Sequence, residues 1–188
     1  MKCLPNCQNI DFSDNRYKSF WVRMAELRIP LLAHTGGEHT VPVINAALAD
    51  PKLLRFPLAC GVTVIAAHCA TRSGVFDKDY FADWVAMLRE FPNLYGDISA
   101  MVSLNRCGRL PDCLEPEILP RIIHGSDFPV PVLGHRLWLQ RVIDRRTFRG
   151  IQNIKNPLER DWQFKAAIGF PDEILTRAAS LLRWPEKK

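Results

Sequence analysis

The stretch VTVIAAH, Val62–His68, decides the fold class, because four β-branched residues in a row favour a buried strand and the run ends on an imidazole. A second apolar run, IPLLAH at Ile29–His34, also ends on a histidine and is followed by Thr-Gly-Gly. NLYGDIS at Asn93–Ser99 and RIIHGSD at Arg121–Asp127 read as two further short strands. Strands of this kind, separated by longer amphipathic stretches, predict an α/β protein with a parallel sheet.

Helices are expected between and after these strands, in segments where apolar residues recur at helical spacing. Ser13 or Asp14 is expected to cap the first helix, and Asp77 a later one. In the first helix, the residues expected on one apolar face are Phe20, Trp21, Met24 and Leu27. The expected helical segments are 13–28, 77–91, a short helix at 114–119, and two helices in 157–184 broken at Gly169-Phe170-Pro171. Residues 43–60 are expected to be helical or turn-rich, with interruptions at Pro51 and Pro57.

Composition indicates a single globular domain over residues 1–188, since 47% of the residues are hydrophobic. The net charge of +5 comes from scattered basic residues and does not indicate nucleic-acid binding. No apolar run is long enough to cross a membrane, so no membrane partner is expected. Six cysteines without a CxxC pair favour reduced thiols and a cytoplasmic location, and Cys3 with Cys7 lacks the second pair of a zinc finger.

Three of the predicted strands end at residues that can bind a metal: His34, His68 and Asp127. The carboxyl ends of parallel strands lie at one edge of a sheet or barrel, so these side chains are expected to meet. Imidazole and carboxylate ligands suit zinc, manganese or iron, and the lack of a thiolate argues against a closed structural zinc site. We therefore expect an open divalent-metal site that activates water and a substrate carbonyl.

Each of these residues also has a purely structural interpretation. A histidine at a strand end often makes only a structural hydrogen bond, and Asp127 could be the Asx residue of a turn. Asp97 is a fourth strand-end candidate that could instead bind a neighbouring loop, and the His124 side chain could point either way. His39 and His135 do not lie at strand ends. The repetition at three strand ends favours the metal site.

Four motifs in this order, IPLLAHTGGEHT, VTVIAAHCAT, NLYGDISAM and RIIHGSDFP, resemble the amidohydrolase superfamily. The branch is amidohydrolase-2, which includes aminocarboxymuconate-semialdehyde decarboxylase-like enzymes. The segment from Asn156 to Arg183 also resembles the closing helices of that branch. The resemblance implies a TIM (β/α)8 barrel whose site lies at the carboxyl ends of the strands.

On this resemblance the four motifs correspond to strands five to eight, and MKCLPNCQNIDFSD to strand four and its loop. His34 would be a metal ligand, and Asp127 a ligand that also handles the proton of the nucleophilic water. His68 would be a catalytic acid/base or a ligand of a second ion. The family's His-x-His pair on the first strand is missing here, so an incomplete barrel of roughly strands four to eight is expected, truncated at its N-terminal side relative to the family.

The expected function is that of a metal-dependent hydrolase acting on a small substrate with a carbonyl or carboxylate group, with zinc, manganese or iron as cofactor. One alternative is a non-oxidative decarboxylase using the same metal centre. Another is a non-catalytic remnant or assembly partner, which the missing ligand pair favours. An incomplete barrel leaves exposed sheet edges, so a homo-oligomer or a separate N-terminal half-barrel partner is also expected.

Overall fold

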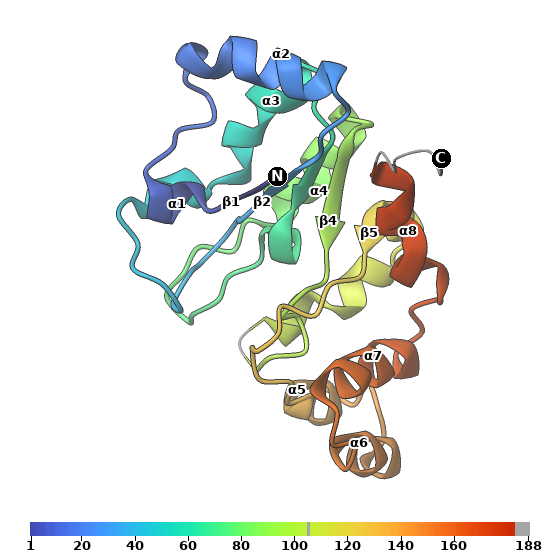
Figure 1. Ribbon diagram of the computed structural model, residues 1–188. Coiled ribbons are helices and arrows are strands. Elements are labelled where there is room, and N and C mark those ends of the chain that lie inside the picture. The colour runs from blue at the N-terminus through green and yellow to red at the C-terminus, as the bar shows by residue number, and fades with distance from the viewer. Residues whose placement is uncertain (105, 183–188) are drawn as a thin grey trace.

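The computed structural model describes residues 1–104 and 106–182, and its centre is a five-stranded sheet in which every neighbouring pair is parallel (Figure 1). The spatial order is the chain order, β1-β2-β3-β4-β5. The predicted α/β class and all the expected strands are confirmed, although each strand is shorter than its apolar run. The bounds are β1 Lys2–Cys3, β2 Leu31–Ala33, β3 Val64–Ala66, β4 Leu94–Asp97 and β5 Ile122–Ile123.

The register of the sheet aligns the carboxyl ends of its central strands. Ala33 pairs with Ala66, and Ala66 pairs with Gly96, so His34 and Asp97 lie in the same row one step beyond. Within the described residues β1 and β5 each pair on one side only, so the sheet is open. This arrangement confirms the expected incomplete barrel.

Parallel pairing requires crossover connections, which contain α-helices between the first four strands and only 3-10 turns between β4 and β5 in the described residues. In Figure 1, α2, α3 and α4 lie on one side of the sheet, α8 lies beside β5, and α5, α6 and α7 form a group beyond the carboxyl ends of the strands. The helices are α1 Pro5–Gln8, α2 Lys18–Glu26, α3 Arg55–Ala59, α4 Phe81–Glu90, α5 His135–Leu139, α6 Arg145–Gln152, α7 Pro157–Ala167 and α8 Glu173–Leu181. Short 3-10 turns occupy Asn15–Tyr17, Ala46–Ala49, Pro51–Leu54, Ala67–Ala70, Cys107–Arg109, Pro111–Leu114 and Leu119–Arg121.

The predicted first helix is present, and Asp14 caps its 3-10 entry by accepting from the backbone N–H of Arg16. Of the four residues expected on its apolar face, two are buried and two are not. Trp21 and Met24 are buried, whereas Phe20 and Leu27 are exposed. A nine-residue helix that packs on one side buries a narrow stripe, and the neighbours of that stripe turn out toward solvent.

Two helix predictions are wrong for identifiable reasons. Asp77 does not cap α4, because its carboxylate accepts from the backbone N–H of Gly74 and lies 2.8 Å from His39 Nε2. No helix spans 114–119, because Glu115 precedes a proline and adopts an extended ψ of 138°. The break at Gly169 and the start of the final helix after Asp172 are confirmed.

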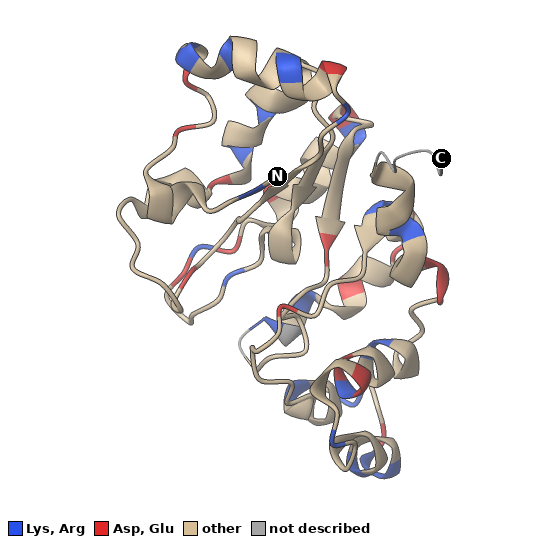
Figure 2. Cartoon of the chain, viewed as in Figure 1, with Lys and Arg blue, Asp and Glu red and all other residues tan. Residues whose placement is uncertain are grey.

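The core lies between the sheet and its covering helices. Its large buried side chains include Trp84 of α4 and Phe164 of α7, and the inward side chains of the central strands are fully buried. Charged residues are spread along the helices and loops, with both signs interspersed, as Figure 2 shows. No described helix is long and apolar enough to cross a membrane.

Candidate functional site

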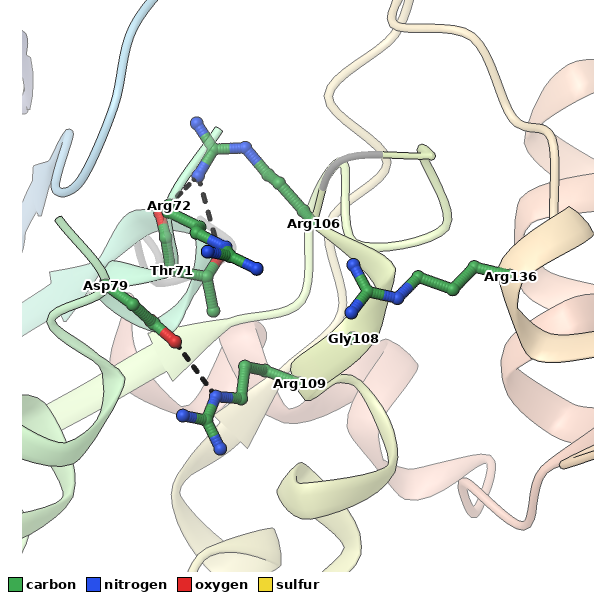
Figure 3. Close-up of a pocket in the computed structure, with 7 residues that line it drawn as sticks. All are labelled: Thr71, Arg72, Asp79, Arg106, Gly108, Arg109 and Arg136. Carbon is green, nitrogen blue, oxygen red and sulfur yellow. Dashed lines mark hydrogen bonds and ion pairs between the residues drawn. The ribbon is translucent and has the colours of Figure 1, made fainter. Parts of the chain in front are cut away.

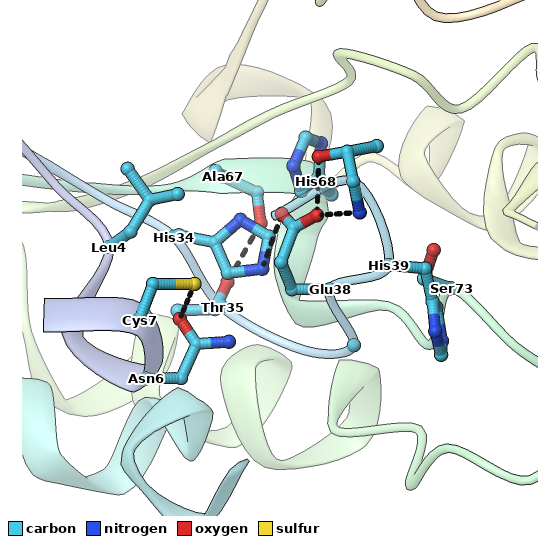
Figure 4. Close-up of polar contacts among 12 residues, drawn as sticks. Leu4, Asn6, Cys7, His34, Thr35, Glu38, His39, Ala67, His68 and Ser73 are labelled. Carbon is cyan, nitrogen blue, oxygen red and sulfur yellow. Dashed lines mark hydrogen bonds and ion pairs between the residues drawn. The ribbon is translucent and has the colours of Figure 1, made fainter. Parts of the chain in front are cut away.

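One cavity of about 360 Å³ collects side chains from the carboxyl ends of three strands. His34 follows β2, His68 follows β3, and Asp127 follows β5, and all three line it together with Lys2 and Glu38. The structure therefore brings together all three residues predicted as site residues. Figure 4 shows the histidine side of this cluster.

His34 presents a buried imidazole with a free nitrogen. Its backbone N–H donates to the carbonyl of Cys3 at 2.8 Å, which fixes the residue to β1, and its side chain is only 2% exposed. Among the described residues no group hydrogen-bonds to Nε2, and the nearest carboxylate oxygen, of Glu38, lies 3.6 Å away. Burial lowers the pKa of His34 to about 4, so the ring is neutral at physiological pH.

His68 is held in an unusual backbone conformation. It begins a run of three residues, His68, Cys69 and Ala70, with φ values of 59°, 49° and 56°. Non-glycine residues rarely adopt positive φ, and such strain is typical of functional sites. The run turns the chain sharply after β3 and places the imidazole 5.3 Å, ring centre to ring centre, from that of His34.

The hydrogen bonds of His68 define its tautomer. Nδ1 lies 2.8 Å from the carbonyl oxygen of Ser99, which can only accept, so Nδ1 carries the proton. Nε2 is then an unprotonated acceptor, and it lies 4.0 Å from Asp127 Oδ2. Burial, with the nearby Arg106 guanidinium as a second cause, lowers the pKa of His68 to about 3. The ring is thus a neutral base aimed at the cavity.

Asp97 supports His68 from β4. Its Oδ1 accepts from the backbone N–H of His68 at 2.9 Å, from the backbone N–H of Ser99 at 3.0 Å and from Ser99 Oγ at 2.5 Å. These contacts agree with the interpretation of Asp97 as a residue that binds a neighbouring loop. It fixes both the strained turn and the residue that orients the imidazole.

Asp127 lies at a positive φ of 58° and is one-third exposed at the cavity. The turn contact expected of an Asx residue is made instead by Ser126, whose Oγ accepts from the backbone N–H of Phe128. Partial burial raises the pKa of Asp127, with smaller opposing effects from Lys2 and Arg106. Its carboxylate is directed at the cavity.

The donor types fit a divalent metal, but the described residues supply only part of a ligand set. A buried imidazole nitrogen without a hydrogen bond in the described part of the chain and a carboxylate facing the same cavity are groups that zinc prefers. Across residues 1–104 and 106–182, however, no three His, Cys, Asp or Glu side chains come together in a group that could hold a metal ion. His34 Nε2 and Asp127 would hold the ion, and further ligands would be needed.

The other histidines lie outside this cavity. His39 is exposed beside Asp77, and His135 stacks edge-on against Phe148 of α6. His124 packs against Trp162, and burial lowers the pKa of His124 to about 4. None of the three lines the cavity of His34 and His68.

Four supporting residues were not predicted from the sequence. Glu38 and Ser99 contact the two histidines, and Arg106 joins two loops by donating to the carbonyls of Gly37 at 2.6 Å and Thr71 at 2.7 Å. Lys165 of α7 donates to the carbonyl of Gly125, two residues before Asp127. These contacts span 31 to 69 residues, apart from the Glu38 contact, so local patterns give little signal for them.

Comparisons with known proteins identify the family and the fold of the chain. The family model Amidohydro_2, described as Amidohydrolase, matches residues 1–163. An uncharacterized TIM-barrel protein from Bordetella bronchiseptica, known as a crystal structure, superposes with a TM-score of 0.52 at 14% sequence identity. The match covers 82% of this chain and 53% of the other, so the chain spans about half the length of that barrel. No curated protein matches the sequence.

Proposed function

The chain belongs to the amidohydrolase family, and we propose that it supplies part of a metal-dependent hydrolase site for a small substrate with a carbonyl or carboxylate group. One observation carries the proposal. The Nε2 atom of His34 is buried and without a hydrogen bond among the described residues, and it faces the cavity that His68 and Asp127 also line. A buried nitrogen left unpaired is costly unless a ligand binds it.

In this chain, two side chains would hold a metal ion and a third would transfer a proton. A divalent ion, zinc by the preference of the donor set, would polarise the substrate carbonyl and lower the pKa of a water molecule. Asp127 and His34 would hold that ion. His68, with its Nδ1 proton donated to Ser99, would accept a proton at Nε2 and return it to the leaving group.

The cavity volume of about 360 Å³ is in the range of small-molecule sites. Lys2 lies at its edge and offers a positive charge to a substrate carboxylate. The same groups would serve a non-oxidative decarboxylase, since a polarised carbonyl also stabilises the electrons left when carbon dioxide departs. Product analysis separates the two reactions, because only decarboxylation releases carbon dioxide.

The missing ligands would come from a second polypeptide segment or a second copy of the chain. Two sheet edges, at β1 and β5, are unpaired in the described structure, and each offers backbone groups to a further strand. We propose that strands supplied there complete both the barrel and the ligand set. We also propose the cytoplasm as its location, because the Cys69 and Cys113 sulfurs lie 4.0 Å apart and both are free thiols.

Zinc binding tests the site. Purified protein is loaded with zinc, dialysed, and measured for metal content and for molar mass in solution. We expect zinc in the wild type and background levels in His34→Ala and Asp127→Ala. The control is His39→Ala, which removes an exposed imidazole outside the cavity and should keep its zinc.

Two results would contradict the proposal. A wild-type protein that takes up no zinc in any assembly state would favour the non-catalytic assembly partner. Equal metal content in the wild type, His34→Ala and Asp127→Ala would place the ion elsewhere. Circular dichroism of each variant confirms that the loss of metal is not a loss of fold.

A further inference from the structure

A second cavity, of about 330 Å³, lies apart from the site above and is lined by four arginines (Figure 3). Arg72 comes from the loop after β3, Arg106 and Arg109 from the segment between β4 and β5, and Arg136 from α5. This cavity and the His34 cavity have no lining residue in common. We call it the arginine cavity.

Two of its arginines are fully engaged by the protein. Arg106 is buried and donates to the backbone carbonyls of Thr71 and Gly37. Arg109 pairs with Asp79 at 3.0 Å and with Asp112 at 3.1 Å. These two side chains form a rigid part of the wall.

The other two arginines have no such partners. Arg72 and Arg136 are both half-buried, and neither side chain makes a hydrogen bond or ion pair with any residue that the structure describes. The Arg136 guanidinium lies against the backbone of Gly108. A Cβ atom added to Gly108 would be 2.5 Å from Arg136 Nη2. Figure 3 shows the Arg136 side chain extending toward Gly108. The Arg136 donors are held at the wall without an acceptor among the described residues.

The charge of the lining is strongly unbalanced. Four guanidinium groups and one carboxylate, that of Asp79, line the cavity, and Asp112 pairs with Arg109 from outside the lining, so an excess of two positive charges remains. Like charges gathered in a concave site repel, because low-dielectric walls screen them poorly. Half-burying a charge without a partner adds a desolvation cost. A bound anion would relieve both effects.

We propose that the arginine cavity binds a small oxyanion carrying at least two negative charges, either a phosphate group or a di- or tricarboxylate. Guanidinium groups bind carboxylate and phosphate oxygens in pairs, and their fork geometry gives specificity as well as affinity. Arg72 and Arg136 supply the free donors and Arg106 supplies a further positive charge, whereas the charge of Arg109 is neutralised by Asp79 and Asp112. A volume of about 330 Å³ admits a small molecule.

The arginine cavity and the His34 cavity are linked by Arg106. Its guanidinium lines the arginine cavity and donates to Gly37, which adjoins Glu38 of the other cavity. It also contributes to the lowered pKa of His34 and of His68. An anion bound beside Arg106 would offset part of that positive charge.

Isothermal titration calorimetry tests the assignment, with inorganic phosphate in one series and citrate in another, at low ionic strength, on protein that was treated with EDTA to remove metal and then dialysed free of the chelator. We expect saturable binding of at least one of them at one site per chain. Arg72→Gln and Arg136→Gln should each weaken binding at least about tenfold, the effect of losing one charge-assisted hydrogen bond. Whichever anion binds more tightly identifies the source of the oxyanion.

Two control variants make the result specific. Arg145→Gln removes an exposed arginine on α6 and changes the net charge equally, so it should bind as the wild type does. His34→Ala should also bind normally, because His34 does not line the arginine cavity. The proposal would be overturned if neither phosphate nor citrate bound. It would also be overturned if Arg145→Gln weakened binding as much as Arg72→Gln and Arg136→Gln do, or if His34→Ala abolished binding. Melting temperatures of all variants establish that each is folded.

Discussion

Replacing Lys165 with methionine is expected to destabilise the protein by about 4–6 kcal/mol. The side chains of Lys165 and Asp161 are 0% and 1% exposed, and Nζ lies 2.5 Å from Asp161 Oδ2. The same Nζ donates to the carbonyl of Gly125 at 2.8 Å, on the segment that leads from β5 to Asp127. One ammonium group therefore neutralises a buried carboxylate and ties α7 to the site segment.

The magnitude follows from what the methionine leaves behind. A buried carboxylate without its partner costs about 3–5 kcal/mol, and an unsatisfied buried carbonyl costs about 1 kcal/mol more. In the double variant Asp161→Leu with Lys165→Met both charges are removed, and the Gly125 carbonyl is the group that loses its partner. That double variant should lose only about 1–3 kcal/mol.

Urea unfolding followed by circular dichroism, near neutral pH, measures the free energy of unfolding of the wild type, both single variants and the double variant. The carboxyl of Asp161 already has a pKa raised by burial, and loss of Lys165 raises it further. A group with a raised folded-state pKa stabilises the protein below its unfolded pKa and loses that contribution as pH rises. The deficit of Lys165→Met should therefore shrink toward acidic pH.

A double variant that lost as much stability as the two single variants added together would refute this coupling. That outcome would mean that the two charges act independently, and that each side chain contributes through packing alone. A deficit of Lys165→Met that stayed constant as the pH fell would likewise show that no unpaired Asp161 carboxylate causes the loss.

Two further substitutions test the pKa of His124 and the packing at β4. His124 has a pKa lowered to about 4 by burial and by Lys165, so its contribution is complete above about pH 6.5 and is lost as pH falls to about 4. The variant His124→Phe keeps a ring in place and removes this titration. Between about pH 6.5 and pH 4 its free energy of unfolding, measured in urea, should therefore fall less than that of the wild type, by up to about 3 kcal/mol. Equal pH dependence of the two free energies of unfolding would contradict this. Gly96→Ala should destabilise by about 1–3 kcal/mol, because its Cβ would lie 2.4 Å from Trp84 Cζ2. Gly150→Ala, on a helix position with open space, is the control and should be neutral or stabilising in thermal unfolding, and equal losses in both variants would argue against overpacking.

The sequence carried enough information to predict the sheet and the meeting of the three site residues. The β-branched run that ends at His68 and the apolar run that ends at His34 are local signals, and parallel pairing aligns their carboxyl ends. The strands are shorter than predicted, because each apolar run continues past the last residue that pairs with a neighbouring strand. Beyond Ala66, the chain leaves the sheet in a left-handed turn instead.

Contacts between distant segments could not be predicted in the same way. Ser99 orients His68 from 31 residues away, and Lys165 reaches Gly125 across 40. Neither contact leaves a periodic trace in the sequence. The sequence analysis does not predict the helices α5 and α6. Each buries one residue, Leu137 in α5 and Ile151 in α6, so neither has a repeated apolar pattern, although Asp144 caps α6 by accepting from the backbone N–H of Thr147.

Backbone strain is concentrated at the edge of the sheet where the candidate ligands lie. Of the eight described non-glycine residues with positive φ, five follow β3, β4 or β5: His68, Cys69, Ala70, Ala100 and Asp127. Each such residue costs on the order of 1–3 kcal/mol, which the surrounding contacts must offset. Asp97 supplies much of that offset, because one carboxylate oxygen accepts three hydrogen bonds from His68 and Ser99. The orientation of the His68 imidazole therefore depends on Asp97, whose position is set by the register between β3 and β4. The geometry of the site thus requires β3 and β4 to stay paired.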